Sequence, residues 1–194
     1  MRRCVMIGFW LIGALLLSQG LYMDVKAKVA QVLISSSWKN RAEDRLPSKP
    51  WWWADTRPIA KLDVPRLNKT LFIMQDDSGE SLAFGPGHLA QSTKPAQDGH
   101  VVIAGHRDSH FSFLRNISIG DTIKTSNYDN QHKQYRVSNI QIINSNKQQL
   151  NLTQNDQLTL ITCYPFDDFI PGGPLRMIVN AIPYNASDKQ TISF

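Results

Sequence analysis

The sequence predicts an all-β domain over residues 59–194, preceded by an apolar segment near the N-terminus. The fold class rests on short apolar or alternating stretches that recur from residue 59 onward, with Gly, Pro, Asn and Asp between them. Short strands with frequent breaks favour a sandwich or a closed barrel. The preceding segment, residues 4–23, contains no charged side chain. We therefore expect one β domain with a hydrophobic appendage.

The apolar segment is long enough to span a membrane. Twenty residues of helix cross a hydrocarbon core of ~30 Å. Arg2 and Arg3 precede the segment and favour a cytoplasmic N-terminus, residues 1–3. The rest of the chain would then lie on the periplasmic or extracellular side of the inner membrane. A cleaved signal peptide is the alternative, but its apolar region is usually only ~7–15 residues long. A single-pass anchor over residues 4–23 is the favoured interpretation.

Residues 24–58 are expected to form a stalk or linker between the anchor and the domain. Pro47 and Pro50 end any helix in this region, because proline lacks the backbone donor and fixes φ. Three tryptophans follow at positions 51–53. They would form either a belt at the bilayer interface or a clasp on the domain. We favour the clasp, because large exposed aromatic patches are rare on soluble surfaces.

Seven strands and two short helical segments are expected in the domain. Strands end where turn-forming residues interrupt the alternation of apolar and polar side chains. The segments at 84–92 and 110–117 are expected to form short helical turns. The expected strands cover residues 59–65, 70–74, 100–105, 121–126, 133–143, 156–163 and 175–182.

The positive charge lies close to the apolar segment and not in the domain. The chain carries a net charge of +5. Residues 36–69 hold eight Lys or Arg and four Asp or Glu, whereas residues 70–194 hold nine and eleven. A basic stretch beside a membrane span favours anionic headgroups, or simply a solvated linker. We therefore expect a membrane partner and no nucleic-acid partner.

Three chemically active residues are expected at the ends of strands. Alternation places His106 at the exit of the strand at 100–105 and Cys163 at the exit of the strand at 156–163. Arg176 lies at the entry of the last strand. If the last two strands pair antiparallel, Cys163 and Arg176 share one rim of the sheet. His106 joins them if its strand runs parallel to that of Cys163.

These three side chains suit acyl transfer through a thiol. A thiol with a pKa near ~8.5 is mostly protonated at neutral pH, and a histidine shifts that balance or protonates a leaving amine. Arginine stays charged and stabilises a developing oxyanion. A zinc site with His100, His106, His110 and Cys163 is disfavoured, because residues 100 and 106 are ~20 Å apart along an extended strand. No metal or other cofactor is expected.

Several stretches together resemble one known family, the sortases. They are IAKLDVPRL, FGPGHLAQS, VVIAGHRDSHF, TLITCYPF and LRMIV. The resemblance implies a closed eight-stranded sortase-type β-barrel with short helical turns, preceded by an N-terminal transmembrane helix. It carries over His106, Cys163 and Arg176 as the catalytic residues. Thr162, next to Cys163, is expected to be a substrate-binding residue. The loop YPFDDFIPGGPLR is most similar to sortases of Gram-negative bacteria.

The resemblance also implies a reaction and its partners. A sortase-like cysteine transpeptidase would cleave a motif like Leu-Pro-x-Thr-Gly between Thr and Gly, form a thioester on Cys163, and transfer the protein to an amine. The expected partners are secreted or surface proteins with a C-terminal sorting signal, an amine acceptor and the cell membrane. The alternatives are a catalytically silent peptide-binding barrel tethered to the membrane and a plain thiol hydrolase.

Overall fold

The computed structural model describes residues 6, 10, 29–39, 48–168 and 172–184. The predicted anchor at 4–23 lies outside these residues, apart from positions 6 and 10. Within the described ranges, no helix is both long and apolar enough to cross a bilayer.

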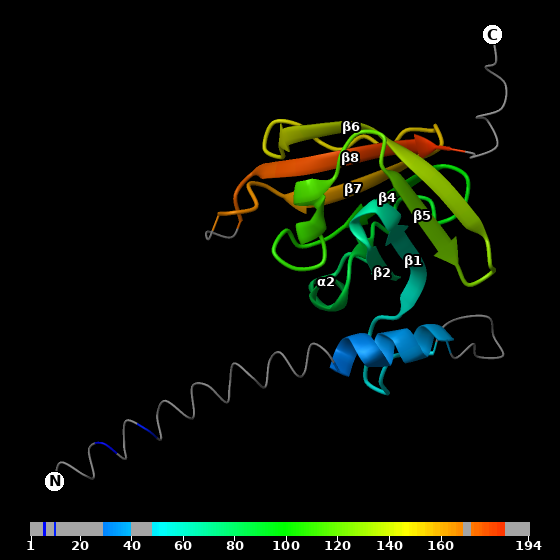
Figure 1. The fold of residues 1–194 in the computed structure, drawn as a ribbon, viewed down its shortest axis with the longest axis vertical. Helices are drawn as coiled ribbons and strands as arrows, with labels where there is room; N and C mark the ends of the chain where they lie inside the picture. The colour runs from blue at the N-terminus through cyan, green and yellow to red at the C-terminus, as the bar shows by residue number, and fades with distance from the viewer. Residues whose placement is uncertain (1–5, 7–9, 11–28, 40–47, 169–171, 185–194) are drawn as a thin grey trace.

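Eight strands form one closed barrel (Figure 1). The order around the barrel is β1-β2-β3-β4-β7-β8-β6-β5. Closure is made by β1, which pairs antiparallel with both β2 and β5. The strands are β1 Pro58–Val64, β2 Lys69–Met74, β3 Gly87–His88, β4 His100–Ala104, β5 Thr122–Asn127, β6 His132–Asn144, β7 Gln157–Cys163 and β8 Leu175–Pro183. The strand pattern alone allowed either a sandwich or a barrel, and the structure is a closed barrel.

All seven expected strands are confirmed to within two residues at each end, and an eighth was missed. The expectation of helical turns at 84–92 is wrong in part, because Gly87–His88 form β3. A Cβ at Gly87 would lie 2.3 Å from the Asp76 carbonyl oxygen, so only glycine lets the chain pass there. The helix α2 Gly79–Phe84 ends where the first expected segment begins, and the 3-10 helix η1 Pro65–Leu67 was not expected. The 3-10 helix η2 Ser112–Asn116 lies within the second expected segment. The last of these confirms the expectation at 110–117.

The barrel interior is filled by side chains that alternate along every long strand. The burial pattern of β1 shows this alternation over its whole length. The 105–117 segment adds aromatic and aliphatic side chains at one end of the barrel. The buried cluster comprises Ala60, Leu62, Val64, Ile73, Val101, Ile103, Phe111, Phe113, Leu114, Ile117, Ile123, Tyr135, Val137, Leu158, Leu160, Met177, Val179 and Ala181.

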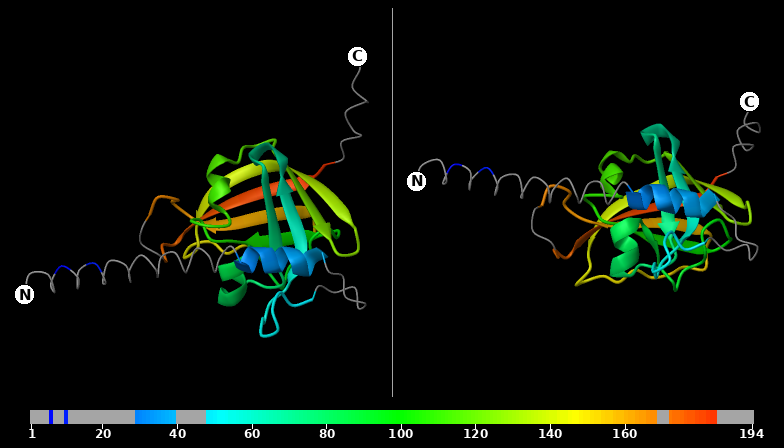
Figure 2. Two further views of the ribbon diagram at one scale, coloured as in Figure 1. Left: turned by 60° about the horizontal axis from the view of Figure 1, so that its bottom comes forward. Right: turned by 90° about the horizontal axis from the view of Figure 1, so that it is seen from below.

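A helix over residues 29–39 lies outside the barrel, beside β1 and β2 (Figure 2). Its Trp38 ring packs against Tyr128 at 4.1 Å and Phe72 at 5.8 Å between centroids. Trp51 packs edge-on against Phe84 of α2 at 4.8 Å. The expected clasp therefore exists for Trp51. It does not extend to the next two tryptophans, which are exposed.

Candidate active site

The strand carrying His106 runs beside and parallel to the strand carrying Cys163. The β4–β7 register pairs Ala104 with Ile161. The ladder continues one step further, because the Gly105 amide donates to the Ile161 carbonyl at 3.0 Å. Residue 106 thus follows β4 at the level at which Cys163 ends β7. The condition under which His106 was expected to join Cys163, a parallel arrangement of the two strands, is met.

Arg176 lies directly across from Cys163 on the other side. Strands β7 and β8 pair antiparallel, with Cys163 opposite Arg176 and Ile161 opposite Ile178. Neighbouring strands lie ~4.8 Å apart. Cys163 is therefore the central residue of three at one rim of the barrel, with β4 on one side and β8 on the other.

All three residues belong to the outer face of the barrel. Leu158 and Leu160 point into the core, so Thr159, Ile161 and Cys163 point outward. The same alternation places positions 104 and 106 outward from β4, and Arg176 outward from β8. Cys163 and Arg176 are partly exposed and His106 is exposed, so the rim is open to a substrate.

The Arg176 guanidinium is turned toward its own loop. Its Nη1 donates to the Gly173 carbonyl, and to the Leu175 carbonyl at 2.9 Å. In this structure backbone carbonyl oxygens accept hydrogen bonds from the guanidinium, whose N–H groups are also suited to an oxyanion or a substrate carbonyl. The guanidinium is thus held at the rim in a hydrogen-bonded position from which it can exchange partners.

Directly before His106 the backbone passes close to a buried aromatic ring, and a glycine makes this possible. A Cβ at position 105 would lie 2.7 Å from Cγ of the buried Phe111 ring. The Phe111 amide in turn donates to the His106 carbonyl at 3.0 Å. Gly105 and Phe111 together fix where the backbone of His106 leaves the sheet.

Two arginines tie the β7–β8 loop to the segment that follows β4. Arg107 Nη2 donates to the Asp168 carbonyl at 2.6 Å. Arg115 forms an ion pair with Asp167 at 2.8 Å, and its guanidinium carbon lies 5.4 Å from the Phe166 ring centroid. The loop after Cys163 and the loop after His106 therefore form one connected rim.

His110 lies near His106 but faces a different element. Burial lowers the pKa of His110, and a hydrogen bond to the backbone of Ala83 in α2 partly offsets this. Coulombic repulsion from His106 lowers the pKa of His110 further, and Asp108 raises it. His110 thus joins the rim loop to α2 as a packed side chain.

Thr162 has a different position from the other predicted site residues. Its side chain is buried, and its hydroxyl donates to the Gly105 carbonyl at 2.8 Å. This contact locks the end of β7 to the end of β4. The geometry gives Thr162 a part in positioning the rim. Its contact with substrate stays a prediction.

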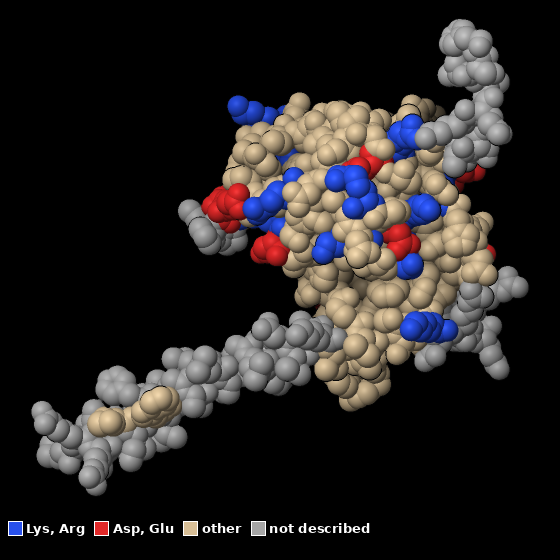
Figure 3. Space-filling model, in the orientation of Figure 1, with Lys and Arg blue, Asp and Glu red and all other residues tan. Residues whose placement is uncertain are grey.

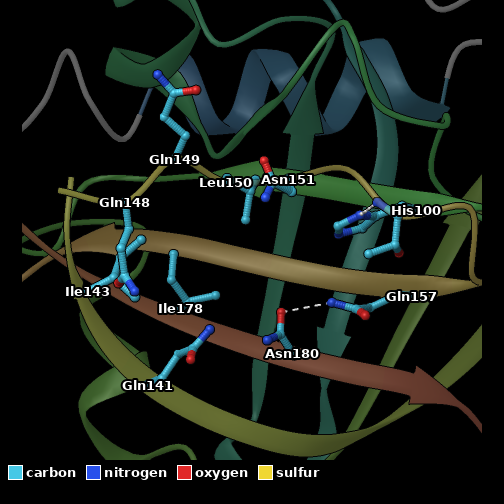
Figure 4. Close-up of a pocket in the computed structure, with 11 residues that line it drawn as sticks. His100, Gln141, Ile143, Gln148, Gln149, Leu150, Asn151, Gln157, Ile178 and Asn180 are labelled. Carbon is cyan, nitrogen blue, oxygen red and sulfur yellow. Dashed lines mark hydrogen bonds between the residues drawn. The ribbon is translucent and has the colours of Figure 1, made fainter. Parts of the chain in front are cut away.

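A cavity of about 490 Å³ lies on the outer face of the sheet, along β8 from the rim (Figure 4). The loop between β6 and β7 forms its roof. Toward the rim the lining is mixed, with Ile143 and Ile178 beside Gln141 and Gln148, and the far end is formed by the polar side chains of His100, Gln157 and Asn180. The lining residues are His100, Gln141, Ile143, Gln148, Gln149, Leu150, Asn151, Thr153, Gln157, Ile178 and Asn180.

The far end of this cavity is organised by a chain of hydrogen bonds. The Thr153 amide donates to His100 Nδ1 at 3.0 Å, so Nε2 carries the proton and donates to Thr159 Oγ1 at 2.8 Å. The Thr159 hydroxyl then donates to Asn180 Oδ1 at 2.8 Å, and Gln157 Nε2 donates to the same oxygen at 2.9 Å. This arrangement fixes the orientation of the Asn180 amide and leaves its NH₂ group available to a ligand.

Comparison with known proteins identifies the family. A sequence model of the sortase domain matches residues 62–183, which is more than half of the chain. The chain belongs to the sortase family. Its matched region includes the strands that carry His106, Cys163 and Arg176.

Individual relatives of this sortase agree with the family match. Sortase D of Bacillus subtilis is 28% identical over 120 residues, which cover 61% of this chain. The chain spans 60% of the length of that relative. The catalytic domain of B. anthracis SrtD is 31% identical, with a TM-score of 0.56 over 66% of this chain and 88% of that one. A Clostridium perfringens sortase D5 transpeptidase, 20% identical, shares the fold with a TM-score of 0.62 over 81% of this chain and 99% of that one.

The predicted subgroup has no support from these relatives. The named proteins come from Bacillus and Clostridium, which are Gram-positive, and not from Gram-negative bacteria. The loop at 164–176 was the single feature behind that assignment. Loops vary more than the strands they connect, so one loop is a weak indicator of a subgroup.

Sequence reasoning missed the outer cavity of this sortase and its polar end. The signal was present in part, because His100, Thr159 and Asn180 lie on the faces already assigned to His106, Cys163 and Arg176. The sequence did not show that the β6–β7 loop folds back over that face. Arg107 and Arg115 also gave no signal, since their partners are more than fifty residues away.

Proposed function

We propose that this sortase is a membrane-anchored cysteine transpeptidase that acts on secreted proteins with an LPxTG-like sorting motif. The observation that carries the proposal is the register around Cys163, with β4 leading to His106 on one side and Arg176 opposite on the other. The anchor is the uncharged stretch at 4–23, with the barrel on the outer side of the inner membrane.

In the first half-reaction, the Cys163 thiolate attacks the carbonyl carbon of the motif's Thr. A carbon–sulfur bond forms, and the Arg176 guanidinium stabilises the oxyanion. The carbon–nitrogen bond to Gly then breaks, and protonated His106 gives its proton to the departing amine. The products are a thioester on Cys163 and a released C-terminal peptide.

In the second half-reaction, an amine acceptor attacks the thioester carbonyl. The new amide bond forms as the Cys163 thiolate leaves, and neutral His106 takes the proton lost by the amine. The anchored enzyme meets substrates held at the same membrane, which raises their effective concentration.

The outer cavity supports one orientation of the bound motif, with its Leu in the cavity and the residue before Leu pointing away from Cys163. Ile143, Leu150 and Ile178 offer apolar contacts to the motif's Leu side chain. The residue before that Leu would then reach the polar end, where the Asn180 amide can donate to a backbone or side-chain carbonyl.

The test uses the full chain in lipid nanodiscs, a fluorescent Leu-Pro-x-Thr-Gly peptide and triglycine. Mass spectrometry should find the acyl fragment on Cys163 and a peptide–triglycine product. Cys163→Ala should abolish both, while Cys4→Ser, which removes the chain's other cysteine, should retain both. His106→Gln should reduce the rate by about 10²-fold or more.

Two outcomes would replace the proposal. Peptide binding without any adduct, equal in wild type and Cys163→Ala, would favour a silent peptide-binding barrel. An adduct that yields only hydrolysed peptide, with or without triglycine, would favour a thiol hydrolase.

A further inference from the structure

Large apolar side chains are exposed together on the N-terminal side of the barrel. Trp52 is 86% exposed and Trp53 is 61% exposed. Three more exposed apolar side chains lie on the helix at 29–39. We define the N-terminal apolar surface as Val29, Val32, Leu33, Trp52 and Trp53. Single exposed apolar residues need no explanation, but five on two adjoining segments do.

The helix at 29–39 exposes three apolar side chains in its first half. Its barrel side is formed by Ala30, Ile34 and Ser37, which are buried and spaced by one helical turn. The opposite side of a surface helix normally carries polar or charged residues. Here the exposed apolar residues Val29, Val32 and Leu33 lie in the first half of the helix, with Gln31 among them. The exposed Ser36 and Lys39 follow toward its end, so the apolar exposure is concentrated at the end nearest the predicted anchor.

The exposure of Trp52 and Trp53 is imposed by buried neighbours. Ala54 is fully buried, and its amide donates to the Trp51 carbonyl at 3.0 Å, which closes a turn. Thr56 is buried too, and its hydroxyl accepts from Ser81 Oγ at 2.6 Å. The two outward rings therefore project from a turn fixed on both sides, and they pack against each other at 5.0 Å between centroids.

The helix and the tryptophan turn are joined to each other. Gln31 Nε2 donates to the Phe84 carbonyl at 2.6 Å, and Trp51 packs on the ring of the same phenylalanine. Further along, the Ser37 hydroxyl donates to the Ser48 carbonyl. Figures 1 and 2 show the turn beside the helix. In Figure 3 the lowest part of the described surface is uncharged on the visible face, and a group of blue side chains lies to its upper right.

The sequence indicates what covers this surface. The uncharged stretch at 4–23 ends only five residues before Val29. Those five residues would span about 8 Å as a helix, and at most about 18 Å if fully extended. The surface therefore lies within reach of the bilayer surface if 4–23 spans it. Tryptophan is the side chain most typical of that interface, and the surrounding stretch at 36–69 is basic, which suits anionic headgroups.

We propose that the N-terminal apolar surface rests in the headgroup region of the membrane and holds the barrel in one orientation on it. The proposal depends on the anchoring part of the proposed function, and not on the transpeptidase chemistry. The occupant is lipid, with Trp52 and Trp53 at the level of the headgroups and Val29, Val32 and Leu33 beside them. The rim with Cys163 would then keep a fixed height above the bilayer, where membrane-held substrates arrive.

The experiment measures tryptophan quenching in nanodiscs made with lipids brominated at a shallow or a deep acyl position. The full chain carries Trp10→Phe, which removes the one tryptophan inside the apolar stretch and leaves those at 38, 51, 52 and 53. Shallow bromines should quench more than deep ones. The double variant Trp52→Ser/Trp53→Ser should lose more than about half of the lipid-quenchable emission, because these are the interfacial rings. Trp38→Phe, which removes a ring packed on the barrel, is the matched control and should retain it.

Other outcomes overturn the proposal in distinguishable ways. If the chain stays in the nanodisc but Trp52 and Trp53 are quenched by aqueous acrylamide and not by bromines, the surface faces water and the anchor stands. If neither agent quenches them, a protein partner or a second copy covers the surface. If the chain is not retained in the nanodisc, the anchor and this proposal fail together.

Discussion

Gly105 determines where His106 can be. Its backbone passes against the Phe111 ring, and a Cβ would lie 2.7 Å from Cγ of that buried ring. Gly105→Ala is therefore expected to lower the free energy of unfolding by about 1–3 kcal/mol, as overpacked sites do. It should also lower the rate of thioester formation, because the strand end that carries His106 must shift. Denaturant unfolding and peptide kinetics measure the two effects.

Gly79→Ala is the matched control for that substitution. A Cβ at Gly79 meets no atom within 4 Å, and the residue opens α2. Alanine there should be neutral or slightly stabilising. Equal effects of the two substitutions would mean that the contact with Phe111 is not what constrains the strand end.

His100 makes stability depend on pH. Burial lowers the pKa of His100, and its Nδ1 accepts the Thr153 amide, so protonation would break that bond. In the unfolded chain histidine titrates near ~6.5. Between the lowered pKa of His100 in the folded state and ~6.5, the unfolded state binds more protons than the folded state. The free energy of unfolding therefore rises with pH in that window and falls as the pH is lowered through it.

The expected result is a weaker pH dependence in His100→Asn. Thermal unfolding between pH 5 and pH 7.5 should show the melting temperature of the wild type falling more steeply toward low pH than that of the variant. His132→Asn, at an exposed position, is the control and should follow the wild type. Parallel curves for wild type and His100→Asn would contradict the assignment of this titration to His100.

At the scale of elements, the β7–β8 loop is held by two different kinds of contact at Arg115. The ion pair with Asp167 joins side chains that are 50% and 83% exposed, so it contributes little. The packing on Phe166 is the larger share. Asp167→Asn should change the free energy of unfolding by less than about 0.5 kcal/mol. Arg115→Ala should cost about 1 kcal/mol and make the loop more sensitive to protease.

A reversed order of these two effects would show that charge, and not packing, holds the loop. Denaturant unfolding gives the free energies, and limited proteolysis with mass mapping gives the loop opening. The comparison is clean, because Asp167→Asn keeps the shape of the side chain and leaves the Phe166 contact in place.

The elements show how far the sequence alone could reach. Alternation of side chains gave the faces and the ends of β4, β7 and β8, which is why Cys163 and Arg176 were expected to meet. It did not give β3, because two residues are too few for a period to appear. Nor did it give the exposure of Trp52 and Trp53, which depends on distant buried neighbours such as Ser81.

At the scale of the whole molecule, closure of the barrel was beyond local patterns. It depends on pairs such as Ala60 with Asn127, which join strands far apart in the chain. Only the family resemblance indicated eight strands in a closed barrel, and the structure confirms both. The chemical roles of His106, Cys163 and Arg176 stay predictions, although their strands meet as expected.

The two-residue strand β3 has a consequence for the motion of the barrel. It joins β2 through one residue pair, Met74 with Gly87, and β4 through two, whereas β7 and β8 share six. The barrel is therefore paired most weakly at β3, and local opening should occur there first. In native-state hydrogen exchange the Met74 and Leu89 amides, which donate beside this strand, should lose protection before that of Val179. When the β3–β4 pairs open, β4 is held by β7 alone, and the strand end that leads to His106 becomes freer to move.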